Sequence, residues 1–230
     1  MKKSIAIITA RGGSKRILRK NIKPFLGHPI IKYSIDAALL ANCFDEVMVS
    51  TDDKEIAEVA KKFGAKVPFL RSEYSSSDFA TSADVLEEVL IEYKKRNKHF
   101  KYCCCIYPTA PFISPERLRE GFKILKNKNA DTVLPVVRFS YPIQRALKIQ
   151  NGRLLIIEPE NLNVRSQDLM LTYHDAGQFY WLKVERFLKH KNLFNENTLP
   201  IEIPELEVQD IDTMEDWKIA ENKYKILKNL

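Results

Sequence analysis

The sequence lacks any apolar run of the roughly 20 residues that a membrane-spanning helix needs, so no membrane partner is expected. It is also poor in glycine and cysteine, with 7 and 4 of them in 230 residues. No two cysteines form a CxxC pair, which argues against a zinc site. Cys103, Cys104 and Cys105 are adjacent, and neighbours on a strand face opposite sides of a sheet. We therefore expect these cysteines to be small core residues, in a protein of a reducing compartment.

The chain begins Met1-Lys2-Lys3, which resembles the basic start of a signal peptide. Arg11 interrupts the apolar stretch that follows, so a first strand is the better interpretation. The expected compartment is therefore the cytoplasm. A chain of 230 residues fits one domain, residues 1–230.

The net charge is +7, from 37 Lys and Arg against 30 Asp and Glu. Such an excess is compatible with nucleic acid, an anionic membrane surface or small anionic ligands. The basic residues form no single block, and the run at 94–96 lies among acidic residues, as on a solvated helix face. Small anionic ligands fit better than nucleic acid, whose only support is the net charge.

Short apolar runs alternate with amphipathic segments along most of the chain. This alternation predicts an α/β fold, a mostly parallel Rossmann-like sheet flanked by helices. Strands are expected at 4–10, 46–51, 66–70, 102–107 and 131–137. Four helices are expected between these strands. One begins at Pro29, and the next is capped by Asp52 and ends at Gly64. The third begins at Thr81 or Ser82, and the fourth at Ser114-Pro115.

The alternation breaks between residues 138 and 175. Apolar segments at 147–149 and 154–156 flank Asn151-Gly152, a typical hairpin turn. We interpret 138–175 as an inserted lobe that is too small to bury a core of its own. Strands are expected again at 178–183 and 205–211, and a final helix from Thr213.

The loop after the first expected strand carries the strongest chemical pattern, Arg11-Gly12-Gly13-Ser14-Lys15, followed by Arg16, Arg19, Lys20 and Asn21. Adjacent glycines let backbone N–H groups approach one anion, and the basic residues concentrate positive charge there. The pattern is neither GxxxxGK[ST] nor GxGxxG. A basic surface loop is the alternative. The position after a strand favours a triphosphate site, because ligands bind beyond the carboxyl ends of parallel strands.

In this loop the sequence resembles the CMP-sialic acid synthetases, and the resemblance continues in order through 49–53, 67–71, 107–111 and 209–213. It implies a fold of the nucleotide-diphospho-sugar transferase type. It also implies a cytidylyltransferase that uses CTP and Mg²⁺ to join CMP to an acidic nine-carbon sugar. Segments 138–145 and 173–181 resemble the members that act on pseudaminic acid.

The resemblance assigns roles to individual residues. Asn21 and Arg71 would hold the cytidine, and Arg11, Lys15 and Lys20 would act catalytically on the triphosphate. Asp210 and Asp212 would bind the metal: residues two apart on a strand face the same way, and carboxylates suit Mg²⁺. Without the resemblance, a helix cap beside Thr213 is the better interpretation of this pair. The full nucleotide set is Arg11, Gly12, Gly13, Ser14, Lys15, Lys20, Asn21 and Arg71.

For the sugar, the resemblance points to Arg165 and Gln167, with Lys148 assisting in sugar binding. The guanidinium of Arg165 can form two hydrogen bonds to a carboxylate. His174 and Asp175 form a candidate pair for hydroxyl or amide groups, although a lone histidine is more often structural. Sialic acid members carry Gln in place of Tyr107 and Asn-Gly in place of Ala176-Gly177, which favours pseudaminic acid. Thr109 and Gln178 complete the candidate sugar set.

Alternatives stay open at this point. One is a synthetase for legionaminic or N-acetylneuraminic acid. Another, of a different class, is a nucleotide-binding protein without turnover, since fold does not fix function. The resemblance also implies a homodimer formed through the lobe at 138–175.

Overall fold

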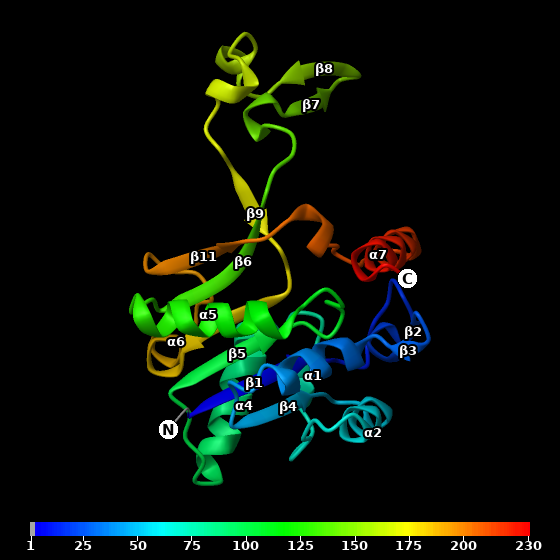
Figure 1. The fold of residues 1–230 in the computed structure, drawn as a ribbon, viewed down its shortest axis with the longest axis vertical. Coiled ribbons are helices and arrows are strands. Elements are labelled where there is room, and N and C mark those ends of the chain that lie inside the picture. Colours follow the sequence, from blue (N-terminus) through cyan, green and yellow to red (C-terminus); the bar gives the residue numbers. More distant parts are fainter. Residues whose placement is uncertain (1–2) are drawn as a thin grey trace.

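The computed structural model describes residues 3–230. A seven-stranded mixed sheet forms the body, in the order β11-β6-β10-β5-β1-β4 with β9 paired to β6, and a small lobe projects from it (Figure 1). The strands of this sheet are β1 Ser4–Thr9, β4 Glu46–Ser50, β5 Tyr102–Ile106, β6 Thr132–Arg138, β9 Tyr173–Asp175, β10 Phe179–Lys183 and β11 Thr198–Glu202.

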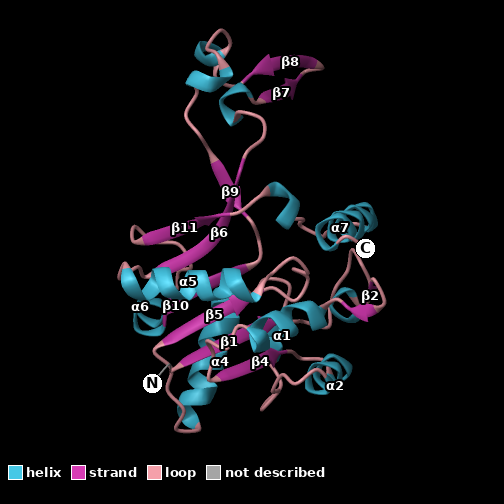
Figure 2. Ribbon diagram, viewed as in Figure 1, coloured by secondary structure: helices cyan, strands magenta, loops and turns pink. Residues whose placement is uncertain are grey.

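Helices cover both faces of the sheet (Figure 2). One face buries apolar side chains of α1, α2 and α5 against the strands, and the other buries those of α4 and α6. A third apolar cluster joins α7 to the hairpin of β2 and β3. The bounds are α1 Ile31–Leu40, α2 Lys54–Lys62, α3 Glu73–Ser76, α4 Ser82–Lys95, α5 Pro115–Asn127, α6 Val184–His190 and α7 Met214–Lys228, with β2 Pro24–Phe25 and β3 His28–Pro29.

The central strands decide where a ligand can bind. β1 pairs in parallel with both β4 and β5, so the carboxyl ends of the three strands meet at one edge. The chain leaves β1 toward β4 and later returns on the other side of β1 as β5, which creates a switch point between β1 and β5. Crevices at such points are the usual ligand sites of open α/β sheets.

The inserted lobe begins and ends on the sheet. β6 carries the chain out and β9 brings it back antiparallel, with Arg138 opposite Tyr173 and Val136 opposite Asp175. Between them lie a separate hairpin and three short 3₁₀ turns, held away from the body (Figure 1). Their bounds are β7 Leu147–Gln150, β8 Arg153–Ile156, η2 Ile143–Arg145, η3 Pro159–Asn161 and η4 Ser166–Asp168.

Several local predictions are confirmed. Thr81 caps α4 in a reciprocal box with Asp84, and Ser114 caps α5 with Pro115 in its first turn. The hairpin turns at Asn151 and Gly152 with φ of 53° and 71°, as an Asn-Gly turn requires.

Other predictions at element ends are wrong. The helix expected from Pro29 begins at Ile31, because Pro29 lies in β3. Asp53 rather than Asp52 caps α2, which ends at Lys62, two residues before Gly64. Each error is a shift of one or two residues, within the range over which local sequence patterns leave element ends undetermined.

Two of the expected strands do not form. At 66–70 only Lys66 bridges to Met48, since Pro68 has no N–H for a ladder. At 205–211 the chain turns as η5 Glu205–Glu207 and then runs without a strand partner. The edge strand is instead β11, which the sequence did not predict, because residues 198–202 lack a clear apolar alternation. No helix of residues 3–230 is long and apolar enough to cross a membrane.

Candidate active site

A cavity of about 440 Å³ opens at the switch point between β1 and β5. Its walls come from the loop after β1, the segment after β5 and the start of α4. Six of the predicted nucleotide residues line it, namely Arg11, Ser14, Lys15, Lys20, Asn21 and Arg71, together with Tyr107 and Thr109 from the predicted sugar set. The structure therefore brings most of the predicted nucleotide set and two residues of the predicted sugar set to one place.

The loop after β1 is anchored to the turn between β4 and α2. The N–H of Gly12 donates to the Asp52 carboxylate at 2.8 Å. A Cβ on Gly12 would lie 2.9 Å from Asp53 Oδ2, so only glycine allows this approach, whereas Gly13 faces open space. Close contact with Asp53, rather than positive φ, is the structural requirement at Gly12.

Arg19 contributes to the same anchor. Its Nη2 lies 3.1 Å from Asp53 Oδ1 and it also pairs with Glu55, while its own backbone is left-handed with φ of 55°. The hydrogen bond from Arg19 lowers the pKa of Asp53. The sequence pattern predicts Arg19 as one of the charges around a phosphate, but in the structure Arg19 holds the loop.

Two basic side chains of the cavity share one acidic partner. Arg11 Nη1 lies 3.0 Å from Asp78 Oδ1, and Lys15 pairs with the other oxygen of Asp78. All three side chains are solvent-exposed, and exposed pairs contribute little to stability. Arg11 and Lys15 can therefore exchange Asp78 for phosphate oxygens at small cost. Nothing in the local sequence singled out Asp78.

Arg71 and Asn21 are buried in the floor of the cavity. Arg71 donates to the Ser50 hydroxyl at 3.0 Å and to the Ser50 carbonyl at 2.6 Å, and burial lowers its pKa. The Asn21 amide donates to the Arg11 carbonyl at 2.8 Å, which fixes the backbone of the loop. Arg71 brings a buried cation to the cavity, and Asn21 sets the position of Arg11.

The predicted metal pair lies beside the cavity rather than in its lining. The buried Ile211 packs in the same cluster as Ile17 of the loop and Trp217 of α7. Asp212 is thereby placed 2.6 Å from Arg16 and 3.6 Å from Lys20, while Asp210 is exposed. The premise that the pair sits on a strand is wrong, since 208–212 lies outside any strand.

These two carboxylates can still serve Mg²⁺. No cluster of three or more His, Cys, Asp or Glu side chains able to hold a metal occurs in residues 3–230. Mg²⁺ is, however, usually bound through one or two carboxylates, with substrate phosphates and water supplying the rest. A pair of aspartates next to a cavity lined by Arg11, Lys15 and Lys20 fits that requirement.

Tyr107 forms a polar and aromatic part of the cavity wall. Its hydroxyl lies 3.4 Å from Ser82 Oγ, and burial raises its pKa. Its ring stands 5.5 Å from that of Tyr180, centroid to centroid. Sequence reasoning missed Ser82 and Tyr180: Ser82 read as a helix start and Tyr180 as one apolar residue of a buried strand.

Three further sugar candidates lie outside the cavity lining. Gln178 is buried and donates to the Glu207 carbonyl at 2.6 Å. His174 Nδ1 contacts the Asp175 carbonyl at 2.9 Å, and its ring lies against Phe139. The Asp175 carboxylate accepts from the Tyr180 hydroxyl at 2.5 Å and from the Gly177 N–H at 2.8 Å. The structure places these residues at the base of the lobe.

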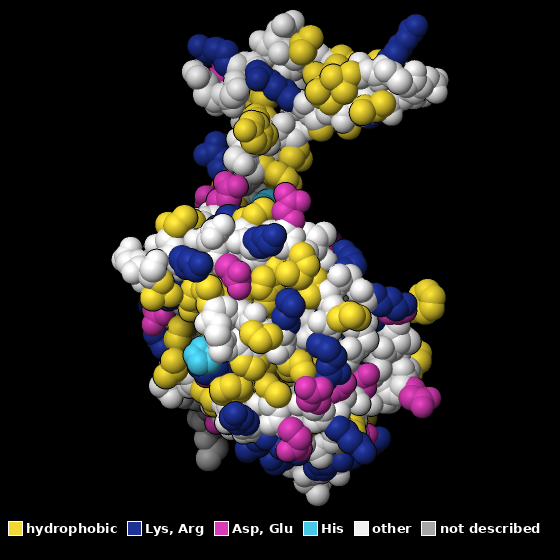
Figure 3. Space-filling model, turned by 90° about the vertical axis from the view of Figure 1, so that its right-hand side faces the viewer, with side chains coloured by type: hydrophobic (Ala, Val, Ile, Leu, Met, Phe, Trp, Pro, Cys, Tyr) yellow, Lys and Arg dark blue, Asp and Glu magenta, His cyan; other side chains and the backbone are white. Residues whose placement is uncertain are grey.

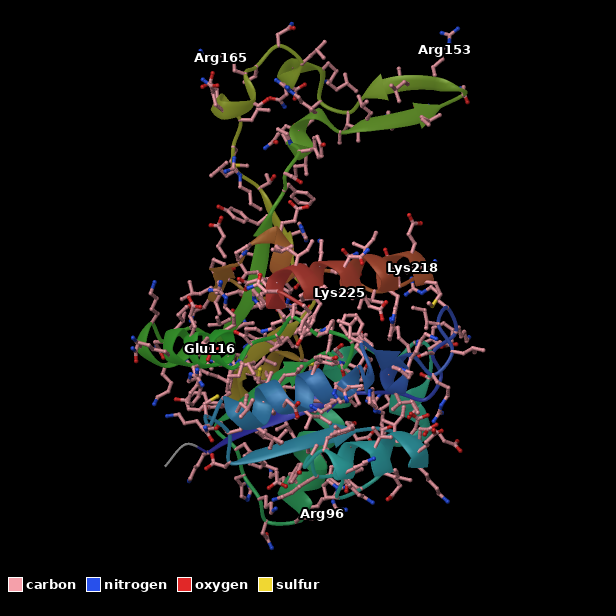
Figure 4. All side chains as sticks on the ribbon, turned by 45° about the vertical axis from the view of Figure 1, so that its right-hand side comes forward. Arg96, Glu116, Arg153, Arg165, Lys218 and Lys225 are labelled. Atoms are coloured by element: carbon pink, nitrogen blue, oxygen red, sulfur yellow. The ribbon has the colours of Figure 1, made fainter. Side chains whose placement is uncertain are left out.

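Lys148, Arg165 and Gln167 lie on the lobe itself, far from the cavity of their own chain. Lys148 is on β7 and Gln167 on η4. Arg165 points away from the body at the far end of the lobe (Figure 4) and pairs with Asp168 at 2.8 Å. The structure thus separates these three candidates from the other sugar candidates.

Comparisons with known proteins agree on the chemistry. A family model described as cytidylyltransferase matches residues 5–215. The chain is 40% identical to a pseudaminic acid cytidylyltransferase of Campylobacter jejuni over 97% of both chains. It is 33% identical to a CMP-N,N'-diacetyllegionaminic acid synthase of Legionella pneumophila over 94% of both.

A solved structure confirms the predicted fold class. A CMP:2-keto-3-deoxy-manno-octonic acid synthetase complexed with CTP superposes with a TM-score of 0.71 over 99% of both chains. Sequence identity is only 16%, so this likeness concerns the fold alone.

Proposed function

The chain belongs to the cytidylyltransferase family and is a nucleotidyltransferase, and we propose that it transfers CMP from CTP to the anomeric hydroxyl of pseudaminic acid. One observation carries the proposal. In a chain 40% identical to a pseudaminic acid cytidylyltransferase, Arg11, Lys15 and Arg71 converge with Tyr107 and Thr109 on one cavity at the sheet's switch point. Cations for a triphosphate and groups for a sugar therefore adjoin each other.

The reaction is an in-line displacement at phosphorus. The anomeric oxygen forms a bond to the α-phosphorus, the bond from that phosphorus to the bridging oxygen breaks, and pyrophosphate leaves. The hydroxyl proton passes to solvent. Catalysis of this kind depends mainly on positioning and on neutralising charge.

Arg11, Lys15 and Lys20 supply that charge. Arg11 and Lys15 sit on the loop that Gly12 and Arg19 anchor, so their backbone positions are set before CTP arrives and only their side chains have to leave Asp78. Lys20 donates to the Ile211 carbonyl at 2.6 Å, which directs its ammonium toward the acidic segment beside the cavity. Charge that develops on the departing pyrophosphate meets cations that are already in place.

The cytidine is proposed to lie against Asn21 and Arg71. Both are buried in the cavity floor, where water does not compete for their donors. The Arg71 guanidinium is oriented by Ser50 through two hydrogen bonds. Its remaining donors are free to bind a carbonyl or phosphate oxygen of the nucleotide.

Mg²⁺ is the proposed cofactor, and Asp210 and Asp212 are the carboxylates that would hold it. When bound, it neutralises phosphate charge and lowers the pKa of a hydroxyl. Asp212 already contacts Arg16 and Lys20, so its carboxylate connects the metal pair to the triphosphate loop.

A homodimer is proposed on the exposed apolar surface of the lobe. Hydrophobic side chains gather there (Figure 3), and Tyr141, Ile149 and Leu154 are 85%, 79% and 65% exposed. A lobe without a core of its own needs a partner surface. In a dimer, Arg165, Lys148 and Gln167 would be available to the partner's cavity, which explains their distance from their own.

Product analysis tests the proposal. The protein is incubated with CTP, Mg²⁺ and, separately, pseudaminic, legionaminic and N-acetylneuraminic acids, and the nucleotide sugar is identified by mass. CMP-pseudaminic acid as the main product is the expected result. CMP-legionaminic acid as the main product would favour the alternative that the Legionella pneumophila relative represents. Absence of any nucleotide sugar would overturn the proposal.

A further inference from the structure

A carboxylate at the edge of the cavity already engages part of the proposed phosphate site. Asp78 accepts from Arg11 Nη1 through its Oδ1 at 3.0 Å, and from the Lys15 ammonium through its Oδ2. Lys15 and Arg11 both lower the pKa of Asp78, so this carboxylate is ionised at neutral pH. Its two oxygens engage the two cations in the way that two oxygens of one phosphate group would.

The segment that carries Asp78 is fixed at both ends. At its start, the Ser72 N–H donates to Glu88 of α4 at 2.9 Å, and at its end Thr81 caps α4. Between these ends, Phe79 is 94% exposed, so its ring does not pack the tip of the segment against the body. The ion pairs of Asp78 tie this tip to the loop after β1, and they can open while both ends of the segment stay in place.

Arg11 and Lys15 cannot serve Asp78 and a phosphate group equally at the same time. A phosphate that reaches both side chains displaces the carboxylate or remains close to it, where like charges repel. In either case Asp78 lowers the affinity of the site for the phosphate. The effect is modest, because exposed ion pairs are weak and are screened by solvent.

This competition matters most for a ligand that is held by its phosphates alone. CTP also carries a cytidine, proposed to lie against Asn21 and Arg71, so it keeps a second set of contacts when its phosphates bind less tightly. Pyrophosphate, the leaving product, has no such second set. A competing carboxylate therefore keeps pyrophosphate binding weak without preventing CTP from binding.

We propose that Asp78 is an internal competitor for phosphate: it holds Arg11 and Lys15 while the site is empty and promotes the release of pyrophosphate after the transfer. This inference rests on the proposed function and adds control of product release to it. A carboxylate that merely held the loop in place would have the opposite effect when removed, since a loosened loop binds phosphate less well. The sign of the change in affinity therefore separates the two roles.

Asp78→Asn tests the proposal, because the amide keeps the shape of the side chain and loses its charge. Pyrophosphate, CTP and cytidine are titrated calorimetrically into the wild type and the variant. We expect pyrophosphate and CTP to bind about three- to tenfold more tightly to the variant, and cytidine, which has no phosphate, to bind equally to both proteins. Unchanged or weaker pyrophosphate binding in the variant would overturn the inference.

The same segment offers a matched control. Glu73 is exposed in the first turn of α3, so Glu73→Gln removes an equal charge five residues away from Asp78. All three affinities should stay as in the wild type. Tightening of pyrophosphate binding by the same factor in both variants would show a general effect of net charge, and would overturn the specific role of Asp78.

Product inhibition carries the test into turnover. Added pyrophosphate should inhibit Asp78→Asn at concentrations about three- to tenfold lower than those that inhibit the wild type. Equal inhibition of the two proteins would contradict a role in product release. If the binding results are as expected but the wild type makes no nucleotide sugar from any of the sugar acids, the proposed function fails while the competition by Asp78 stands.

Discussion

Arg16 Nη1 lies 2.6 Å from Asp212 Oδ2, although 196 positions separate the two residues in the chain. This ion pair joins the basic loop after β1 to the segment that leads into α7. The neighbouring residues Ile17 and Ile211 pack with Trp217 of α7 in one buried apolar cluster, which holds the two segments together. The two halves of the proposed catalytic apparatus, cationic and acidic, are thus assembled by the packing of α7.

Asp212→Ala is expected to reduce turnover by about a hundredfold or more, as loss of an electrostatic stabiliser typically does. The fold should persist, because the Asp212 side chain is 35% exposed and outside the core. Initial rates over a range of Mg²⁺ concentrations measure the effect. Glu215→Ala, an exposed carboxylate in the first turn of α7, is the control and should keep full turnover.

Arg16→Ala separates metal binding from loop anchoring. It breaks the same ion pair but leaves both carboxylates, so turnover at saturating Mg²⁺ should fall much less than in Asp212→Ala. Equal losses in the two variants would show that Asp212 serves only to hold Arg16, and the metal assignment would have to be abandoned.

Lys15→Ala should weaken CTP binding and slow turnover, since it removes a cation from the cavity wall. Lys95→Ala, on α4 and paired with Glu92 of its own helix, should do neither. Calorimetric titration of CTP into each variant compares them. Similar affinities in the two variants would remove the loop from the nucleotide site.

Gly12→Ala and Gly13→Ala test how the loop is held. A methyl group on Gly12 would meet Asp53 at 2.9 Å and push the loop off its anchor, whereas one on Gly13 meets nothing within 4 Å. KM for CTP should rise at least tenfold in Gly12→Ala and only slightly in Gly13→Ala. The reverse order would contradict the anchoring by Asp52 and Asp53.

The lobe should make the protein a dimer at micromolar concentration in sedimentation velocity. Ile149→Glu places a charge on its exposed apolar surface and should yield monomer, with loss of turnover because the partner's lobe residues are removed. Ile226→Glu, at a side chain that is also well exposed but lies on α7, should leave the dimer intact. A wild type that sediments only as monomer would refute this assembly.

The sequence predicted those parts of the site that follow from local pattern. Arg11 to Lys20 and Tyr107 to Thr109 could be placed at one sheet edge, because each follows a recognisable buried strand. The anchoring of Gly12 by Asp52 and Asp53 could not be predicted, since it depends on contact between two loops about 40 residues apart. Tyr180 was missed for a similar reason, because its hydrogen bond to Asp175 joins two different strands, β10 and β9.

The lobe shows that a local element can be predictable while its place in the fold is not. Its hairpin was predictable from Asn151-Gly152, but its separation from the body was not, because no local pattern says which surface an apolar strand will cover. The expected strand at 205–211 failed on the same ground. Instead of extending the sheet, Ile211 packs with α7 and the loop after β1. Val208 joins the core cluster that includes α1, α2 and α5.

Competition between sugar acids tests the central claim most directly. The protein is given CTP, Mg²⁺ and equal amounts of pseudaminic and N-acetylneuraminic acids, and the two nucleotide sugars are quantified by mass at early times. A site that hydrogen-bonds a substrate group rejects an analogue lacking it far better than an apolar pocket rejects an added atom. We expect CMP-pseudaminic acid in at least tenfold excess, and equal or greater amounts of CMP-N-acetylneuraminic acid would contradict the account.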